Sequence, residues 1–524
     1  MERRNGLRML GVPVGWAAVL LAGCGGRGVL VPPGYSPTSV GIGDARATEA
    51  LGPDRPPDVA PTPAAPSDPK GKTPFQLPQT LPGVEAPPVP QLKFDKDTPA
   101  VEREKQVREA FPRLPAPPAT RLGNGEPLTL TVLQQTAMQN SPVLRRTRAD
   151  AEVAFGNAQQ AGLHPNPTVG YQADQIQPGN KPKPLNNAGQ HGGFVNQLIK
   201  TAHKLSLAEA VSGYDYLNAV VAARRSEVDV STAVRTAYFT ALVARQSMEV
   251  NGSLAELADE VYKLQLRQVA GGEAAGYEPL QLYAQAVQAR NASTQAEASY
   301  KAAWRQLAAA VAQPDLPLGA LAGRAETPAP EADFDSLRER MLENHTDILT
   351  AKNSLLQART NLTLQRRIPI PDLATNSYYQ YDNVAQNFQF GVQLGIQIPI
   401  SDRNQGAVFA ATATIARATE NVGAVRNDLS GRLGEAMGRY ESARATATNY
   451  RTKIIPALTT SYRALIRRYQ VDDPGKVQFN DIVVAQQNLA TALQSWLTAL
   501  GIQWQSVVDI GALTQQDDLF ATEK

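Results

Sequence analysis

The chain has 524 residues, enough for two to four ordinary domains, and its formal net charge is only +2. Because it has neither a strong positive charge nor a basic block, nucleic-acid binding has no electrostatic basis in this sequence. There is one cysteine, so the chain cannot form an internal disulfide or a thiolate metal cluster. Aromatic residues make up only 6% of the chain, while Ala and Gln are abundant, which favours long helices over a compact mixed core.

The N-terminal stretch that ends at Cys24 has the layout of a bacterial export signal. Arg3, Arg4 and Arg8 precede an apolar stretch that ends in Leu-Ala-Gly-Cys. This stretch is too short to span a membrane as a helix and is interrupted by Gly and Pro. Its end resembles the lipobox of bacterial lipoproteins, which predicts a signal peptide at residues 1–23 and acyl chains on Cys24. A short membrane anchor, or an ordinary signal with a chance cysteine, is the alternative.

Residues 24–120 are rich in proline, with stretches such as PDRPPDVAPTPAAPSDP. Such a segment has little apolar surface to bury, so it cannot offset the entropy lost on ordering. We therefore expect an extended linker here and no folded domain.

From residue 121 onward the sequence contains an internal repeat. LQQTAMQNSPVL, residues 133–144, aligns with LRERMLENHTDIL, residues 337–349, at a constant offset of 204 in the numbering. The same offset maps the two prolines of HPNP onto those of IPIP. Each proline pair ends a helical segment and opens an extended one, since proline lacks a donor and restricts the residue before it. The sequence thus predicts two repeats, residues 121–324 and 325–524.

Each repeat is expected to contain two strands and two long helices. Proline-free stretches permit helices of about 65 residues, roughly 100 Å long, and turns rich in Gly, Asp and Pro follow at residues 270–277 and 471–476. The predicted strands are residues 168–176, 193–199, 373–381 and 388–400. The second return helix carries a narrow apolar seam, which predicts helix packing: Leu489, Leu493, Trp496, Leu500, Trp504 and Val507.

The strand at residues 388–400 has the clearest pattern. Every even position is apolar, whereas the odd positions are Gln, Gly or Pro, so one face is continuously apolar and the other is small and polar. The strand is long enough to cross a bilayer, where about 9–11 tilted residues suffice. Tyr378, Tyr379 and Tyr381 are expected at the membrane interface. Four strands cannot close a barrel, so several chains must contribute; a strand of a soluble sandwich is the alternative.

Residues 126–511 resemble the TolC-like outer-membrane factors of tripartite efflux pumps and type I secretion. The resemblance rests on LTLTVLQQTAMQNSPVLRRTRADAEVA, on HPNP and IPIP, and on IQIPISDRNQGAVFAA. It also rests on the return helices that begin YEPLQLYAQAVQAR and VQFNDIVVAQQNLATALQSWLTAL. IPISDRNQG is most similar to the cation and heavy-metal efflux branch. The first-half counterpart departs from that branch, because Ala202-His203-Lys204 stands where a Gly-Gly-Lys-like turn is usual.

The resemblance implies a mainly α-helical fold with a membrane β portion. Three copies would form a homotrimer with one 12-stranded β-barrel in the outer membrane, continued by the long helices as a tunnel into the periplasm. The lipid-anchored chain would passively conduct metal cations or drugs, delivered by a periplasmic adaptor and an inner-membrane pump. The alternatives are a duct for type I protein secretion, or a periplasmic adaptor, which would be expected to have one hairpin flanked by small β domains.

The resemblance also implies that the helical turns contact the adaptor and that carboxylates line the narrow end of the tunnel. The candidate adaptor-contacting residues are Gly271, Gly272, Glu273, Pro474 and Gly475. The candidate gate and selectivity residues are Asp472, Asp473 and Asp481, which threefold symmetry would multiply into rings that concentrate cations. For Asp472 and Asp473, a role confined to the turn is the alternative.

No enzyme activity, cofactor or metal site is expected. The four histidines lack the i,i+4 spacing and the acidic companions of metal sites. His191 is expected in a Gly-rich loop between strands, in contact with solvent, and a contact with a metal cation is the alternative there.

Overall fold

The computed structural model describes residues 80, 82, 84–92, 94, 98–115, 126–176, 189–327, 331–383, 385–471 and 479–515. The chain divides into two compact units, residues 16–88 and the remainder, and the account below concerns the second unit. Within the described residues, no helix is long and apolar enough to cross a membrane. The signal peptide and Cys24 lie outside the described residues, so the predicted lipid attachment stays a prediction.

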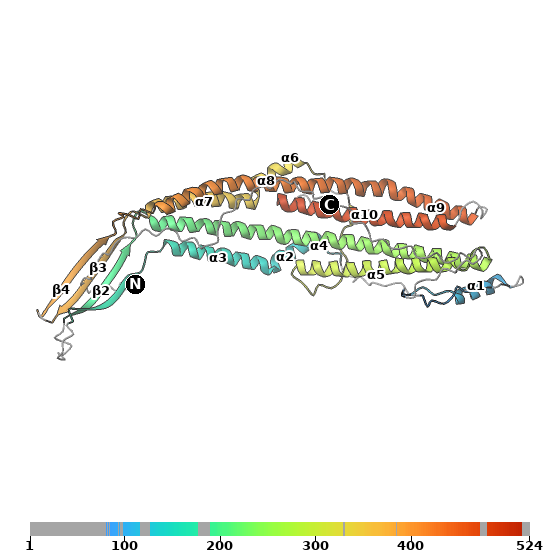
Figure 1. Cartoon of the computed structure of the whole chain (residues 1–524), viewed down its shortest axis with the longest axis horizontal. Coiled ribbons are helices and arrows are strands. Elements are labelled where there is room, and N and C mark those ends of the chain that lie inside the picture. Colours follow the sequence, from blue (N-terminus) through green and yellow to red (C-terminus); the bar gives the residue numbers. More distant parts are fainter. Residues whose placement is uncertain are drawn as a thin grey trace, which may run out of the picture. The chain divides into compact units, whose positions relative to one another are not determined.

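The two predicted repeats have the same order of elements (Figure 1). The first contains α2 (Leu130–Asn140), α3 (Pro142–Gly162), β1 (Thr168–Asp174), β2 (Gln190–Ile199), α4 (Lys204–Gly271) and α5 (Glu278–Ala310). The second contains α6 (Phe334–Asn344), α7 (Thr346–Arg367), β3 (Leu373–Asp382), β4 (Asn387–Ile396), α8 (Gln405–Asn449), a π-helical turn (Tyr450–Ile454), α9 (Ile455–Val471) and α10 (Phe479–Thr514). Because both ends of α6 follow those of α2 at the offset expected from the sequence, the structure confirms this offset.

Side-chain caps fix the start of both repeats. The hydroxyl of Thr129 accepts a hydrogen bond from the backbone N–H of Val132 at the start of α2. In the same way, the carboxylate of Asp333 accepts from Ser336 N–H at the start of α6. Each cap satisfies one of the N–H groups that a helix leaves unpaired in its first turn.

The long helices pack as two antiparallel pairs, α4 with α5 and α8–α9 with α10, and α4 also contacts α10. The predicted seam on α10 is confirmed, since five of its six residues are buried and Leu493 packs against the core. At its centre, Trp504 stacks on Phe239 of α4 with ring centroids 4.2 Å apart. The indole N–H of Trp504 donates to the carbonyl of Ala325 at 2.8 Å, so the burial of this large ring leaves no polar atom unpaired.

The second long helix reaches the predicted turn at residue 471, although Pro456 lies within it. A π-helical turn spans Tyr450–Ile454, and α9 then continues through Pro456 to Val471. Proline has no N–H to donate, and its ring crowds the carbonyl of the preceding turn. A wider turn with i→i+5 hydrogen bonds relieves that conflict, which explains why the helix continues without a break.

The four strands form one antiparallel sheet in the order β1-β2-β3-β4. All four predicted strands are present, but the last was predicted too long, because β4 ends at Ile396 rather than at residue 400. Pro399 cannot donate to a ladder, and Ile400 N–H instead donates to the carbonyl of Ile398 in a tight turn. The strand therefore has ten residues, within the length needed to cross a bilayer.

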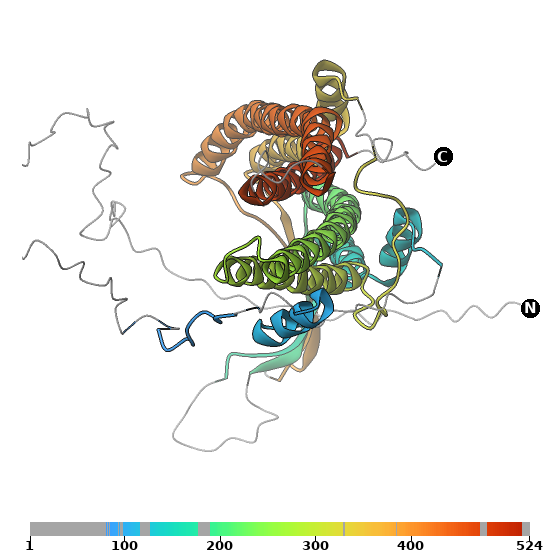
Figure 2. The ribbon, with the colours of Figure 1, turned by 90° about the vertical axis from the view of Figure 1, so that its right-hand side faces the viewer.

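The end of the predicted linker is not extended. Residues 100–110 form a helix, α1 (Ala100–Ala110), whose Val107 is buried together with Phe111 against Val269 and Ala270 of α4. Figure 2 shows α1 lying along the α4–α5 pair, away from α8, α9 and α10. The expectation of extended structure was thus wrong for these residues, because their apolar side chains are buried by a distant part of the chain.

A carboxylate shared by two lysines joins the repeats where strands meet helices. Lys204, the first residue of α4, and Lys200 lie 2.8 and 2.9 Å from the Asp372 carboxylate, which precedes β3. The backbone N–H of Thr201 also donates to this carboxylate at 3.0 Å. Burial acts to raise the pKa of Asp372, but the hydrogen bonds from Lys204, Thr201 and Lys200 outweigh it and hold the pKa well below its usual value.

We expect Asp372→Asn to destabilise the fold by about 3 kcal/mol, the low end for breaking a buried pair, because Lys200 is partly exposed. A carboxylate with a lowered pKa stabilises the fold above its unfolded pKa of about 3.9 and loses that contribution as the pH falls below it. Denaturant unfolding of the purified protein between pH 7 and about pH 3 measures both effects.

Asp428→Asn, which removes an exposed carboxylate 3.7 Å from Arg432, is the matched control and should change stability by less than about 1 kcal/mol. Equal stability and an unaltered pH profile in the Asp372 variant would show that the shared carboxylate does not hold the junction.

Candidate functional site

The sheet has two chemically distinct faces. On β4, the apolar side chains that alternate from Phe388 to Ile396 are between 58% and 66% exposed. The strand register places Tyr379 and Tyr381 of β3 on the same face, opposite Phe390 and Phe388. Val169 and Tyr171 of β1 also lie there and are 72% and 70% exposed. The structure thus confirms the apolar face and extends it to the weakly patterned first strands.

The opposite face carries a hydrogen-bonded polar cluster near the strand turns. Gln190 of β2 and Gln389 of β4 donate to the Asp382 carboxylate at 2.9 and 3.2 Å. Gln380 lies between them and donates to both Gln190 and Gln389. Gln380 and Asp382 are nearly buried, and their polar atoms are paired, as burial requires. This face offers neutral amides and the carboxylates of Asp174 and Asp382, a surface suited to water.

Two predictions about the strands were wrong. Tyr378 does not share the face of Tyr379; its ring covers Gly391 on the polar face, where a Cβ atom would clash with the ring. His191 lies within β2 rather than in a loop, paired with Tyr381, and its Nδ1 is 2.5 Å from the hydroxyl of Tyr171. The alternation of side chains along the strand decides the face of Tyr378, whereas His191 lies in a strand because β2 begins at Gln190, before the predicted start at residue 193.

The turn between α4 and α5 lies at the opposite end of the molecule from the strands (Figure 1). Gly272 ends α4 in the left-handed conformation with φ 80°, and its N–H donates to the carbonyl of Val269. Glu273 N–H donates to the carbonyl of Gln268. Gly271, Gly272 and Glu273 are exposed at this turn, where a partner can reach them.

Only one of the candidate gate residues lies in the described part of the chain. Asp481 is exposed in the first turn of α10, next to the buried Ile482 and Val483. Asp472, Asp473, Pro474 and Gly475 lie outside the described residues. The helix dipole stabilises a carboxylate in the first turn of a helix. This stabilisation accounts for Asp481 at this position, where its side chain is exposed to solvent.

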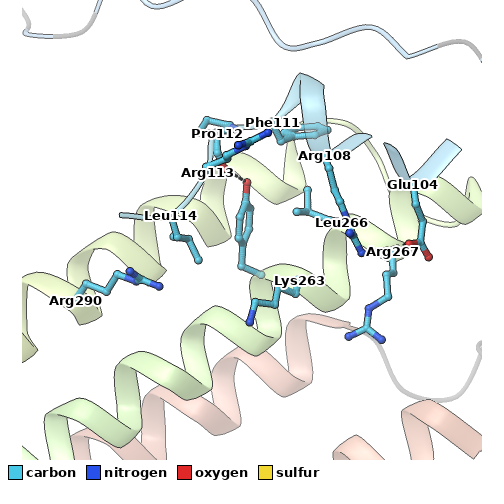
Figure 3. A pocket seen from close by; sticks show the side chains of 11 residues that line it. Glu104, Arg108, Phe111, Pro112, Arg113, Leu114, Lys263, Leu266, Arg267 and Arg290 are labelled. Carbon is cyan, nitrogen blue, oxygen red and sulfur yellow. Dashed lines mark hydrogen bonds and ion pairs between the residues drawn. The ribbon is translucent and has the colours of Figure 1, made fainter. Parts of the chain in front are cut away.

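One surface near the α4–α5 turn was not anticipated from the sequence. The segment after α1 crosses α4, where the Tyr262 hydroxyl donates to the carbonyl of Pro112 at 2.8 Å. Burial, with a smaller contribution from Tyr283, raises the pKa of Tyr262 to about 12, so the phenol keeps its proton at any physiological pH. Between this segment and α4 lies a cleft of about 900 Å³ with many basic side chains (Figure 3). The residues that line this cleft are far apart in the sequence, so the sequence analysis did not predict it.

Within the described residues, no group of three or more His, Cys, Asp and Glu side chains is placed to hold a metal ion. The features that distinguish this part of the chain are the sheet with its two unlike faces and the long helices.

Residues 337–514 match the model of the outer membrane efflux protein family. These residues extend from α6 to the end of α10. Among curated proteins, the chain is 23% identical over 397 residues to the cobalt-zinc-cadmium resistance protein CzcC of Cupriavidus metallidurans, covering 73% of the chain and 89% of that relative.

Solved structures share the fold of this chain. The outer membrane protein VceC of Vibrio cholerae superposes with a TM-score of 0.61 at 16% identity, covering 74% of this chain and 96% of that one. A membrane protein from Pseudomonas aeruginosa gives a TM-score of 0.63 at 15% identity, with 78% and 99% covered. Other structures with this fold are outer-membrane channels.

We expect an arginine on the apolar face of β4 to impair insertion, whereas one on the polar face is tolerated. Leu394→Arg should cost about 2–4 kcal/mol near a bilayer midplane, while Gln393→Arg, on the neighbouring residue of the same strand, should insert normally. Folding into lipid vesicles, followed by urea titration, compares the two variants. Equal damage from both substitutions would contradict the assignment of the faces.

Proposed function

We propose that the chain is the outer-membrane channel of a tripartite efflux system and acts as a homotrimer. The observation that carries this proposal is the sheet, which has an exposed apolar face and two unpaired edges, on β1 and β4. Open edges are not tolerated in lipid, so the edges must pair with other copies. Three copies of four strands supply the 12-stranded barrel that the resemblance implies.

The helices support the second part of the proposal, a tunnel through the periplasm. At 1.5 Å per residue, the 68 residues of α4 extend for about 100 Å. The exposed turn with Gly271, Gly272 and Glu273 then lies far from the membrane, where a periplasmic adaptor of an inner-membrane pump would meet it. An acylated Cys24 would tether the chain to the outer membrane, and the mass of the mature N-terminal peptide tests this attachment.

We infer that the cargo is a divalent metal cation. Support comes from the relative named as a cobalt-zinc-cadmium resistance protein, and from the DRNQG sequence after β4 that resembles the heavy-metal branch. The polar sheet face carries amides and the Asp382 carboxylate, a surface compatible with hydrated cations.

Deletion of the gene should lower the tolerance of the host to cobalt, zinc and cadmium without changing its tolerance to hydrophobic drugs. The wild-type chain supplied on a plasmid should restore growth, and so should the matched control Gln393→Arg, whereas the Leu394→Arg variant should not. Growth of each strain at graded metal and drug concentrations measures its tolerance. Lost drug tolerance with unchanged metal tolerance would favour drug efflux, and a missing secreted protein would favour type I secretion.

We propose that Asp481 contributes a ring of three carboxylates at the narrow end of the tunnel. Such a ring concentrates cations, so Asp481→Asn should weaken cation selectivity and block by multivalent cations in single-channel recordings. Asp509→Asn, near the other end of α10 and paired with Arg439 at 3.2 Å, is the control. Unchanged selectivity and block in the Asp481 variant would place the constriction elsewhere.

A further inference from the structure

The cleft beside the α4–α5 turn is bounded by two segments that are far apart in the sequence. One wall is the segment from Glu104 to Leu114, and the other is formed by α4 and α5 (Figure 3). Its volume of about 900 Å³ lies within the range of sites that hold ligands. The charged side chains that line it are Glu104, Arg108, Arg113, Lys263, Arg267 and Arg290.

Apolar packing and one hydrogen bond hold the outer wall in place. Val107 and Phe111 are 1% and 4% exposed, and they pack on the last turn of α4. The Tyr262 hydroxyl fixes the chain at Pro112. These contacts place Arg113 across the cleft from Lys263 and Arg267, so basic groups face it from both walls.

The basic groups in the cleft exceed the acidic groups that pair with them. Arg108 lies 3.3 Å from Glu104, Lys263 lies 2.7 Å from Glu260, and Arg290 donates through Nε to Asp259 at 3.0 Å. Arg113 and Arg267 form no ion pair with any residue that the structure describes.

Arg290 places a further positive charge in the wall of the cleft. Its side chain is only 11% exposed and is paired with Asp259. Its Nη1 atom is buried and has no hydrogen-bond partner among the described residues. Arg290 therefore adds positive charge to the cleft, whereas the guanidinium groups of Arg113 and Arg267 are exposed and can bind a ligand directly.

We propose that this cleft binds a carboxylate-bearing segment of a partner protein, which docks at the side of the α4–α5 turn. Guanidinium groups bind carboxylates through paired, charge-assisted hydrogen bonds, and the exposed Arg113 and Arg267 supply two of them. The identification of the partner as the periplasmic adaptor rests on the proposed function, whereas the acidic chemistry of the docking segment does not.

The lining favours a protein segment over a free polyanion. Leu114, Leu266 and Tyr262 contribute apolar surface between the cations, and an acidic amphipathic helix can cover both kinds of surface. A glycan or a nucleic acid offers charge without apolar side chains, so the apolar part of the cleft would remain uncovered.

The test uses the full chain in detergent and a fluorescent amphipathic helical peptide with Glu on its polar face. The same peptide with Gln in place of Glu, together with heparin and inorganic phosphate, serves as comparison. We expect the Glu peptide to bind in preference to the Gln peptide. The double variant Arg113→Glu, Arg267→Glu should weaken that binding about tenfold or more, whereas Arg113→Lys, Arg267→Lys should retain most of it. Arg305→Glu, an exposed α5 residue outside the cleft, should bind like the wild type.

Equal binding of the Glu and Gln peptides, or equal loss in the Arg305 variant, would overturn the proposal. Tighter binding of heparin or phosphate that is lost in the double variant would also overturn it, by showing a site for polyanions. Conductance of the wild-type chain in planar bilayers tests the proposed function separately, because peptide binding needs no channel activity. A conducting chain without a preference for the Glu peptide therefore refutes only the docking site.

Discussion

Backbone pairing at the two edges of the sheet is the constraint on which the rest of the structure depends. β1 and β4 each present a row of peptide groups that no other described strand pairs, next to a broad apolar face. In a bilayer each unpaired peptide group costs several kcal/mol, so the sheet of a single copy would be unstable there. In the proposed homotrimer, the two helical pairs that continue each sheet would meet those of the neighbouring copies.

The sequence predicted the elements in which one periodicity extends over a long stretch. The alternation in β4 predicted its exposed apolar face, and the seam on α10 predicted its buried face. The constant offset predicted the order of elements in the two repeats. Their boundaries were less accurate, because the end of β4 depends on a turn at Ile398 and Ile400. The continuation of α9 through Pro456 depends on a local change of hydrogen-bond pattern that periodicity does not encode.

The basic cleft could not be predicted, because it depends on contacts between segments that are distant in the sequence. The composition of residues 24–120 predicted an extended linker, yet Val107 and Phe111 are buried against the last turn of α4. A short amphipathic helix leaves only a weak signal among many prolines. Tertiary burial overrides such a signal, and the cations of the cleft come together only once that burial has occurred.

The carboxylate of Asp372 shows how far the two repeats have diverged. It belongs to the second repeat and pairs with Lys200 and Lys204 of the first, whereas the offset of 204 places Thr168 at the corresponding position of the first repeat. Neither half therefore contains both the acid and the bases of this junction. Cutting the chain into its two halves would not yield two interchangeable subunits, and a ring of six copies of either half would leave buried charges of one sign without partners.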